Sequence, residues 1–405
     1  MADAPNTVSS LNGLFKEVYG DDIKQLVPDG AKVQKYIPFA PKQKELGNQY
    51  HQPVLLAYEN GFTFAAADSG AFSLNDAVNS VMKDATVNSS QIVLKAQMSY
   101  EAAAKAAKGR NAFQDATDLM FESMQKSMRK RIEVECMYGV RGLATVASVS
   151  SLTITITTAE FAPGIWSGME GASINVYDTT LATNRGSAVI TSVDLDARTI
   201  TVDAVPSGTV ATDVIFYAGA KGNEMTGIHS ILTNTGSLFG ISAATYTLWK
   251  SSSQAAGGAL SQAIIGKAIS KAVAKGLDDD CLLLVNPKTW TDLLSDQAAL
   301  VRHTGSAIGS KVQNGSQSIE FYSQNGNVRI EPSIYVKEGY AYGLSLPAWM
   351  RLGASDVTMK TPGYGDDIFQ QLQTKAGYEV RSYTSQAVFS HAPGKNFIIT
   401  GIVNS

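Results

Sequence analysis

The stretch 111–143, NAFQDATDLMFESMQKSMRKRIEVECMYGVRGL, decides how the chain is organised. Residues 111–138 contain neither glycine nor proline, and their apolar side chains recur every three or four residues. This spacing predicts one amphipathic helix. Twenty-eight residues at about 1.5 Å each give a rod of roughly 42 Å, which ends at Gly139 and Gly142. The apolar stripe comprises Phe113, Ala116, Met120, Met124, Met128, Ile132 and Cys136.

The charges of this helix are segregated along its length. Acidic residues come early in the helix, and the basic residues of the 126–131 run come late. Both positions complement the helix dipole. The basic run could contact nucleic acid, but a solvated or intersubunit face is the favoured interpretation. The methionines indicate packing rather than a cofactor site.

A β-rich segment follows the glycine break, from 145 to 221. Its alternating strands are separated by turns, which predicts a small barrel or sandwich that folds nearly autonomously. The expected strands are Leu152–Thr157, Ala188–Val193, Thr199–Val202 and Val214–Tyr217. Glycines at 139, 142, 219 and 222 mark the two joints with the rest of the chain.

The remainder mixes helices and strands without a repeating βαβ order, which indicates an α+β fold. A second amphipathic helix is expected from Leu260 to Val273, and Lys288–Leu294 is expected to begin a third. Expected strands are Gln91–Met98, Cys281–Val285, Val328–Pro332, Tyr340–Leu346, Gly377–Phe389 and Asn396–Ile402.

The N-terminal third has a different character. Glycines and prolines break residues 1–41 into an arm that cannot bury itself. Residues 42–81 have the pattern of an extended hairpin, with a turn signal at Asn60-Gly61. The small residues from Ala65 to Gly70 predict that this hairpin becomes ordered only against another molecule. A short alanine-rich helix is expected at Glu101–Lys108.

Composition narrows the function classes. At 405 residues the chain is expected to form two or three structural units. Charged residues make up 17%, against about 25% in ordinary domains, which fits a surface largely hidden in contacts. The net charge of −3 argues against a dedicated nucleic-acid binder. Cys136 and Cys281 are expected to be buried free thiols, and neither a signal peptide nor a membrane-spanning stretch is present in the sequence.

No catalytic, cofactor-binding or metal-binding residue is predicted, and the chain is not expected to be an enzyme. The four histidines lie far apart and lack a metal-ligand partner at helical spacing. Asp278-Asp279-Asp280 and Asp366-Asp367 could bind a divalent ion, but each has the pattern of a solvated turn. The sequence contains no nucleophile elbow, phosphate loop or dinucleotide fingerprint.

The order of these segments resembles the major capsid protein of tailed bacteriophages, with the Hong Kong 97-type fold. The residues that carry the resemblance are Gly139–Leu143, Met225–Leu232, Leu284–Trp290 and Gly377–Tyr383. The resemblance implies an N-terminal arm (1–41), an extended loop (42–82), a peripheral domain with its spine helix (83–144), a mainly axial domain (222–350) and return strands of the peripheral domain (351–405). The inserted β domain (145–221) is the departure. It could decorate the exterior, brace neighbours or aid folding.

The resemblance further implies a structural protein that self-assembles into the icosahedral head around a double-stranded DNA genome. Its partners would be itself, as pentamers and hexamers, a separate scaffolding protein, the portal protein, a decoration protein where one exists, and packaged DNA bound non-specifically. No membrane is involved. The expected location is the virion, after assembly in the host cytoplasm, without N-terminal processing. The alternative is a phage tail or adhesin-type binding protein that uses the β insert for recognition.

Overall fold

The computed structural model describes residues 30–40, 49–101, 116–295, 319–324, 326–360, 368, 370–372 and 375–404. Most of the arm, Phe113, Asp366-Asp367 and nearly all of the helix expected at 101–108 lie outside these residues. The chain divides into two compact units. One comprises Met1–Val27, Leu94–Ser127 and Met359–Ser382, and the other comprises Pro28–Val93, Met128–Thr358 and Tyr383–Ser405.

The predicted spine helix is α3, Ala116–Tyr138, and it ends at the predicted residue. Residues 111–115 lie outside the described part. Met124, Met128, Ile132 and Cys136 are buried, so the phase of the apolar stripe is confirmed. Met120 is partly exposed.

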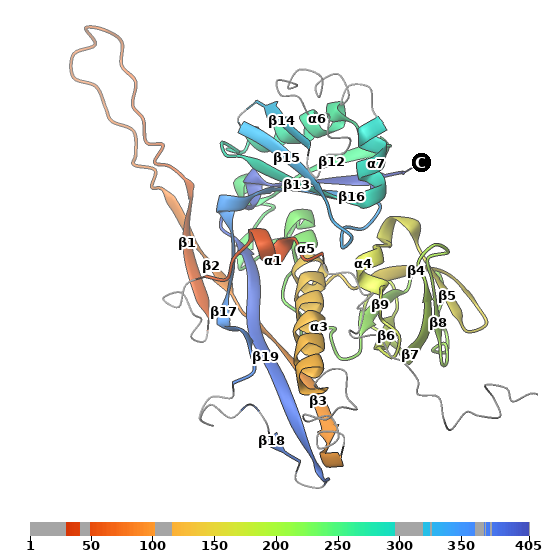
Figure 1. Ribbon diagram of the computed structural model, residues 1–405. Helices are drawn as coiled ribbons and strands as arrows, with labels where there is room; N and C mark the ends of the chain where they lie inside the picture. The colour runs from red at the N-terminus through yellow and green to blue at the C-terminus, as the bar shows by residue number, and fades with distance from the viewer. Residues whose placement is uncertain are drawn as a thin grey trace, which may run out of the picture. The chain divides into compact units, whose positions relative to one another are not determined.

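A six-stranded mixed sheet forms one core of the larger unit. Its order is β12-β20-β16-β13-β15-β14. The strands are β12 (Ser252–Gly258), β13 (Cys281–Val285), β14 (Ile319–Ser323), β15 (Gly326–Pro332), β16 (Tyr340–Ser345) and β20 (Phe397–Ile402). β12 pairs in parallel with β20, and β13 pairs in parallel with β15. Helix α6 (Gln262–Val273) packs its apolar face on the sheet, and α7 (Pro287–Ser295) contributes Trp290 and Leu293 (Figure 1).

Two details of this sheet differ from the prediction. β20 pairs with β16 and β12 in this sheet, whereas the sequence grouped residues 397–402 with the return strands of 351–405. Its run Phe-Ile-Ile is apolar on both faces because it lies inside a sheet. The edge strand β12 was not predicted, because its sequence SSQAAGG has no hydrophobic alternation.

The inserted segment is a closed barrel of order β4-β5-β8-β7-β6-β9. Its strands are β4 (Ala144–Ser150), β5 (Thr153–Ile156), β6 (Ser173–Tyr177), β7 (Asn184–Asp194), β8 (Thr199–Val202) and β9 (Val214–Tyr217). Alternate residues such as Ile154, Ile156, Ile200 and Val202 fill the interior. The four predicted strands are present. β4 and β6 were not predicted. The register of β4 shifts between Val146 and Ser148, which breaks its alternation, and β6 is only five residues long.

A further sheet has the order β17-β19-β18, with β3 also paired to β19. Within the larger unit, β17 (Trp349–Thr358) runs antiparallel to β19 (Gly377–Ser390) between the pairs Trp349↔Ser390 and Thr358↔Tyr383. Within the smaller unit, β18 (Gln370–Gln371) pairs with the start of β19. β3 spans Ser90–Ser99, as predicted for 91–98. The long strand predicted at 377–389 is confirmed.

The described end of the arm is held by a buried glutamate. Glu133 of the spine helix accepts hydrogen bonds from the backbone N–H groups of Lys32 and Val33 at 2.7 Å each, and from Gln34 at 3.2 Å. These groups start the short helix α1, Val33–Tyr36. Val33 and Ile37 are buried. The arm therefore lies on the body of its own chain at residues 32–37.

Candidate functional site: an exposed loop and a buried junction

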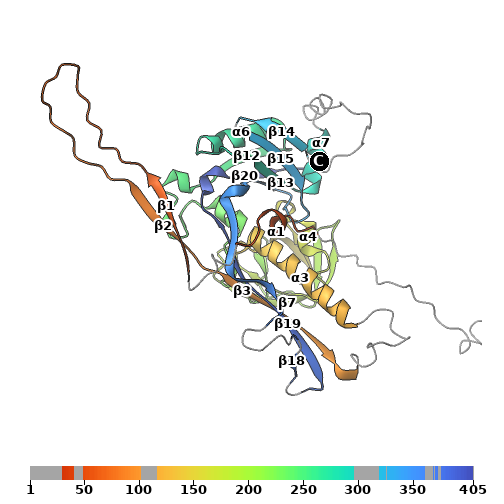
Figure 2. The same ribbon diagram turned by 60° about the vertical axis from the view of Figure 1, so that its left-hand side comes forward.

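The extended loop begins as a two-stranded ribbon. β1 (Tyr50–Ala57) pairs antiparallel with β2 (Val81–Val87), from Tyr50↔Val87 to Ala57↔Val81. Residues 58–80, here called the distal loop, continue beyond the ribbon without strand pairing (Figures 1 and 2). Few hydrogen bonds cross it, among them Asn60 N–H to Val78 O at 3.2 Å and Asn75 N–H to Thr63 Oγ1 at 2.8 Å.

The turn of the distal loop differs from the prediction. Asn60-Gly61 lies in one arm of the loop, close to residues 76–78 of the other. The reversal occurs at Ala67-Asp68, where Ser69 N–H bonds to Ala66 O at 3.2 Å. Asp68 adopts φ +60°, which aspartate tolerates better than most residues. The Asn-Gly pair therefore did not mark the turn.

The distal loop presents large apolar side chains to solvent. Phe64 is 90% exposed and Leu74 is 78% exposed. The other exposed apolar side chains of the distal loop are Tyr58, Phe62, Phe72 and Val78. Scattered apolar residues are normal on a surface, but a concentration of this kind marks an interaction site. The distal loop is therefore a candidate contact surface for another molecule.

The glycine break after α3 is a close backbone crossing. A Cβ on Gly139 would lie 2.1 Å from Met225 O, and one on Gly227 would lie 2.6 Å from Gly139 N. Gly227 N–H donates to Gly139 O at 3.1 Å. The helix end thus meets the chain where it leaves the barrel, just before α5 (Ile228–Thr233). Both predicted cue segments, 139–143 and 225–232, are brought together here.

The late basic residues of the spine helix are engaged within the chain. Arg131 bonds to Glu224 at 3.2 Å, and its guanidinium lies 3.8 Å from the centre of the Tyr217 ring. Lys130 donates to the Ser167 carbonyl oxygen, and burial lowers the pKa of Lys130 to about 8. The interpretation of this run as a solvated or intersubunit face is therefore wrong for Lys130 and Arg131. The inserted segment supplies Ser167 and Tyr217, and Glu224 follows it in the chain.

The loop 333–339, between β15 and β16, forms a buried junction with the barrel and the spine helix. Lys337 is 1% exposed, and its Nζ bonds to Glu160 Oε2 at 2.6 Å and to the Gly142 carbonyl at 3.3 Å. Glu160 ends the 3₁₀ turn η2 (Thr158–Glu160) and also binds Arg141 at 3.0 Å and the Tyr340 hydroxyl at 2.8 Å. Burial opposes ionisation of Glu160, but Lys337 and Arg141 outweigh it and hold its pKa well below the usual range.

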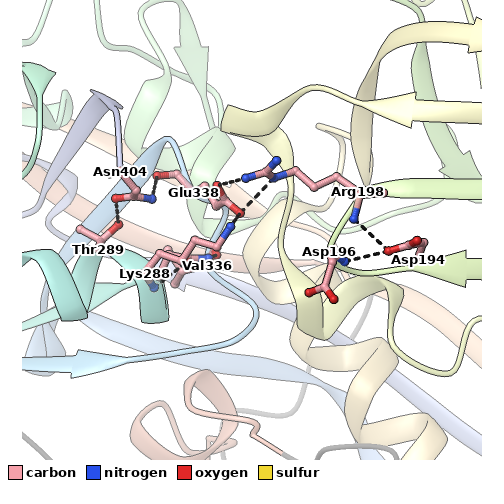
Figure 3. Close-up of polar contacts among 10 residues, drawn as sticks. Asp194, Asp196, Arg198, Lys288, Thr289, Val336, Glu338 and Asn404 are labelled. Carbon is pink, nitrogen blue, oxygen red and sulfur yellow. Dashed lines mark hydrogen bonds and ion pairs between the residues drawn. The ribbon is translucent and has the colours of Figure 1, made fainter.

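The next residue, Glu338, points to a second set of partners. Its carboxylate binds Lys288 at 3.0 Å and Arg198 at 3.4 Å, and Figure 3 shows it between these two cations. Arg198 comes from the barrel, and Lys288 from the start of α7. The Glu338 carbonyl accepts from Asn404, whose Oδ1 in turn accepts from Thr289 at 2.8 Å. Asn286 Nδ2 donates to Val336 O at 2.7 Å and fixes the same loop.

Backbone hydrogen bonds complete the junction. Glu338 N–H bonds to Phe161 O at 3.0 Å, Gly339 N–H to Ala159 O at 2.9 Å, and Gly164 N–H to Ile334 O at 2.9 Å. The segment 159–164 lies between β5 and β6 of the barrel and includes the start of the short helix α4 (Pro163–Trp166). The 333–339 loop is therefore bonded to the barrel by both backbone and side chains.

The other residues that the sequence singled out have structural contacts within the chain. Both cysteines are buried as predicted, and burial raises the pKa of Cys281 to about 12. His229 donates or accepts a bond with Tyr342 OH at 2.9 Å, and burial, with Lys337 and Arg141 nearby, lowers its pKa to about 3. Asp278 and Asp279 pair with Lys395, and Asp280 accepts from Asn327 N–H at 2.9 Å. The acidic triplet is thus a set of turn contacts.

Sequence reasoning missed the residues of the junction. Lys337-Glu338-Gly339 has the composition of an exposed turn, and Glu160 lies 177 positions from its partner Lys337. No local signal joins them. Among the described residues, no cluster of histidine, cysteine, aspartate or glutamate could hold a metal ion. In the same part of the chain, no helix has the length and hydropathy needed to cross a membrane.

Comparison with known proteins finds no match by sequence but several matches by fold. No family model matches the sequence, and no curated protein matches it. Solved structures do match it over nearly its whole length. The cyanophage A-1(L) capsid asymmetric unit is 11% identical, with a TM-score of 0.58, over 98% of this chain and 99% of that chain.

Two further matches come from the capsid of the GTA particle. The native particle gives 10% identity and a TM-score of 0.52, over 99% of this chain and 100% of that one. The empty particle gives 8% identity and a TM-score of 0.51 over the same shares. At such low identity the likeness concerns the fold. The chain has the Hong Kong 97-type capsid fold that its sequence predicts, with a closed β-barrel inserted after the spine helix.

Proposed function

We propose that the chain is a structural capsid protein that assembles into the icosahedral head of a tailed phage around double-stranded DNA. The observation that carries the proposal is the distal loop, whose phenylalanines and leucine are exposed to solvent. The fold shared with capsid chains over nearly the full length supports it.

The proposal gives the two regions different tasks. The distal loop binds neighbouring copies, because burying a phenylalanine or leucine side chain against a partner contributes about 1.5–3 kcal/mol. The junction and the two cores keep the rest of each subunit fixed, so that neighbouring loops find matching surfaces. Association of many identical chains into pentamers and hexamers follows from repeating one contact by symmetry.

Further partners belong to the same proposal. A separate scaffolding protein directs closure, a portal protein occupies one vertex, and a decoration protein binds the exterior where one exists. Contact with the packaged DNA is non-specific, and assembly takes place in the host cytoplasm. A catalytic role forms no part of the proposal.

The alternative of a tail or adhesin-type binding protein would use the barrel as a recognition head. No observation favours it over the capsid proposal. Lys130, Arg131, Glu160 and Arg198 direct contacts of the barrel region inward, to the chain's own helix and loop.

Electron microscopy of the purified chain, expressed with and without its proposed scaffolding protein, tests the proposal. Closed shells of uniform size are expected with the scaffold, and few correct shells without it. Phe64→Ser/Leu74→Ser should abolish shells while leaving the subunit folded by circular dichroism. Leu152→Ser removes a half-exposed leucine from the barrel and serves as the matched control, which should still assemble. Discrete monomers under all conditions, or normal shells from the loop variant, would contradict the proposal.

A further inference from the structure

The two adjacent residues Lys337 and Glu338 make a reciprocal contact with the barrel. Lys337 forms an ion pair with Glu160 of the barrel, and Glu338 forms one with Arg198 of the barrel. The sign of the charge is reversed between the two pairs, so the contacts cannot exchange partners. This crossed arrangement specifies one way of seating the barrel on the 333–339 loop.

The two contacts differ in their access to water. Lys337 and Glu160 are 1% and 7% exposed, whereas Arg198 is 28% exposed and Glu338 4%. The second carboxylate also holds Lys288, which is half-exposed. Solvent and salt therefore reach the Arg198 contact but not the Lys337 contact. The first pair is an anchor, and the second can open while the first stays closed.

The backbone conformation of Arg198 is one that glycine adopts with less strain. Arg198 adopts φ +56°, in the left-handed region that favours glycine and asparagine. It is the last residue of the β7–β8 turn, in which Asp194 accepts from the N–H groups of Asp196 and Ala197 at 3.0 and 2.8 Å. The Arg198 carbonyl accepts from Ile156 N–H at 3.0 Å, which fixes the residue from the other side.

A glycine at this position would make the same turn without strain, so turn geometry does not explain the arginine. Its guanidinium does explain it, because the fixed turn directs both Nε and Nη2 toward Glu338, as Figure 3 shows. We propose that Arg198 and Glu338 form a clasp, which fixes the orientation of the inserted barrel on the subunit and which opens without unfolding the barrel. The barrel is then a seated brace rather than a freely moving appendage.

The clasp lies within one chain, so its test does not require an assembled shell. Hydrogen exchange is measured on the full-length protein by mass spectrometry. The reporting amides are Glu338 and Gly339, which bond to the barrel, and the ladder amides of β8, which bond within it. Arg198→Gly should speed exchange of the two reporting amides by about tenfold, the scale of one charge-assisted contact, and leave β8 exchange no faster.

A matched control comes from the turn between β6 and β7. Leu181 also adopts a left-handed backbone, at φ +60°, in a turn capped by an aspartate, Asp178. It has no ion pair to the 333–339 loop. Leu181→Gly relieves the same kind of strain without removing a clasp, and should leave exchange at Glu338 and Gly339 unchanged.

Two further measurements complete the test. Glu338→Gln should speed the reporting amides as Arg198→Gly does, and the double variant should add little. In about 1 M salt, where the Debye length is about 3 Å, exchange of the wild-type loop should rise while that of Arg198→Gly stays constant. Unchanged loop exchange in Arg198→Gly would overturn the proposal, as would equal acceleration of β8, which would show that Arg198 serves only the barrel fold.

Discussion

The junction around Lys337 and the distal loop around Phe64 use their side chains in opposite ways. At the junction, a lysine and a glutamate are buried, and the wider network satisfies them with a carbonyl, an arginine and a tyrosine. In the distal loop, apolar side chains stand in solvent and few backbone groups are paired within the loop. The first region is satisfied within one chain, and we propose that a partner completes the second.

This difference separates what stabilises the subunit from what assembles it. Substitutions at the buried Lys337–Glu160 pair should destabilise the chain and reduce assembly only as a consequence. Substitutions in the distal loop should leave folding intact and act on assembly directly. Four substitutions test this separation, and none has a larger expected effect on stability than the one before it.

Lys337→Met should have the largest effect on stability. The substitution keeps most of the side-chain volume but leaves Glu160 buried without its closest cation, at a cost of about 3–5 kcal/mol. Urea unfolding of the full-length chain measures the loss. Lys288→Met removes the half-exposed cation that pairs with Glu338. This change should lower the stability of the chain by about 0–1 kcal/mol. Equal losses in the two variants would show that burial does not distinguish these lysines.

Gly139→Ala should have the next largest effect on stability. The new methyl group would lie 2.1 Å from the Met225 carbonyl oxygen, so the backbone must shift, at a cost of about 2–3 kcal/mol. Gly266→Ala is the matched control, because Gly266 lies in helix α6 with open space around its Cβ position. That change should stabilise the chain by about 0.4–1 kcal/mol. Melting temperatures that change in the same direction in both variants would contradict the close backbone crossing at Gly139.

Glu135→Gln tests the buried cluster at the end of the spine helix. Burial, together with the Glu224 carboxylate and opposed by Arg131, raises the pKa of Glu135 from 4.5 to about 7. A carboxyl with a raised pKa binds more protons in the folded state, so its contribution is fully present below pH 4.5 and is lost as the pH rises through about 7.

Between pH 4.5 and 8 the wild type should therefore lose about 2–3 kcal/mol relative to Glu135→Gln. Urea midpoints across this range measure the difference. Parallel pH profiles for the two proteins would rule out a buried carboxyl that takes up a proton on folding.

Phe62→Ser should have the smallest effect on the free subunit. Phe62 is 66% exposed in the distal loop, so its removal should change the stability of the free chain by no more than about 0.5 kcal/mol. Assembly yield, measured by sedimentation, should fall sharply at the same time. A loss of subunit stability comparable to that of Lys337→Met would show that the loop packs on its own chain.

The fold could be predicted where burial controls the sequence pattern. Met124, Met128, Ile132 and Cys136 repeat at helical spacing because one face of α3 is buried. Residues 281–285 are uniformly apolar because β13 lies inside its sheet. Strand β12 could not be predicted, because Ser252–Gly258 is selected by its parallel pairing with β20 rather than by hydrophobicity.

The candidate site was only half predictable. The small residues at 65–70 predict a loop that becomes ordered against a partner, although the Asn60-Gly61 signal misplaced its turn. The junction could not be predicted, because Glu160, Arg198, Lys288 and Lys337 meet only after the barrel, the sheet and the helix end have formed. Each alone has the pattern of an exposed charged residue, and the pairing depends on contacts distant in sequence.

The most direct test of the account compares the free chain with the assembled particle. Limited proteolysis and hydrogen exchange are followed at residues 58–80 and at the barrel, 144–217, in both states. The distal loop should be cut and exchange rapidly in the free chain and be protected in the particle, whereas the barrel core should be equally protected in both. Equal cleavage and exchange of the distal loop in the two states would contradict its role in assembly.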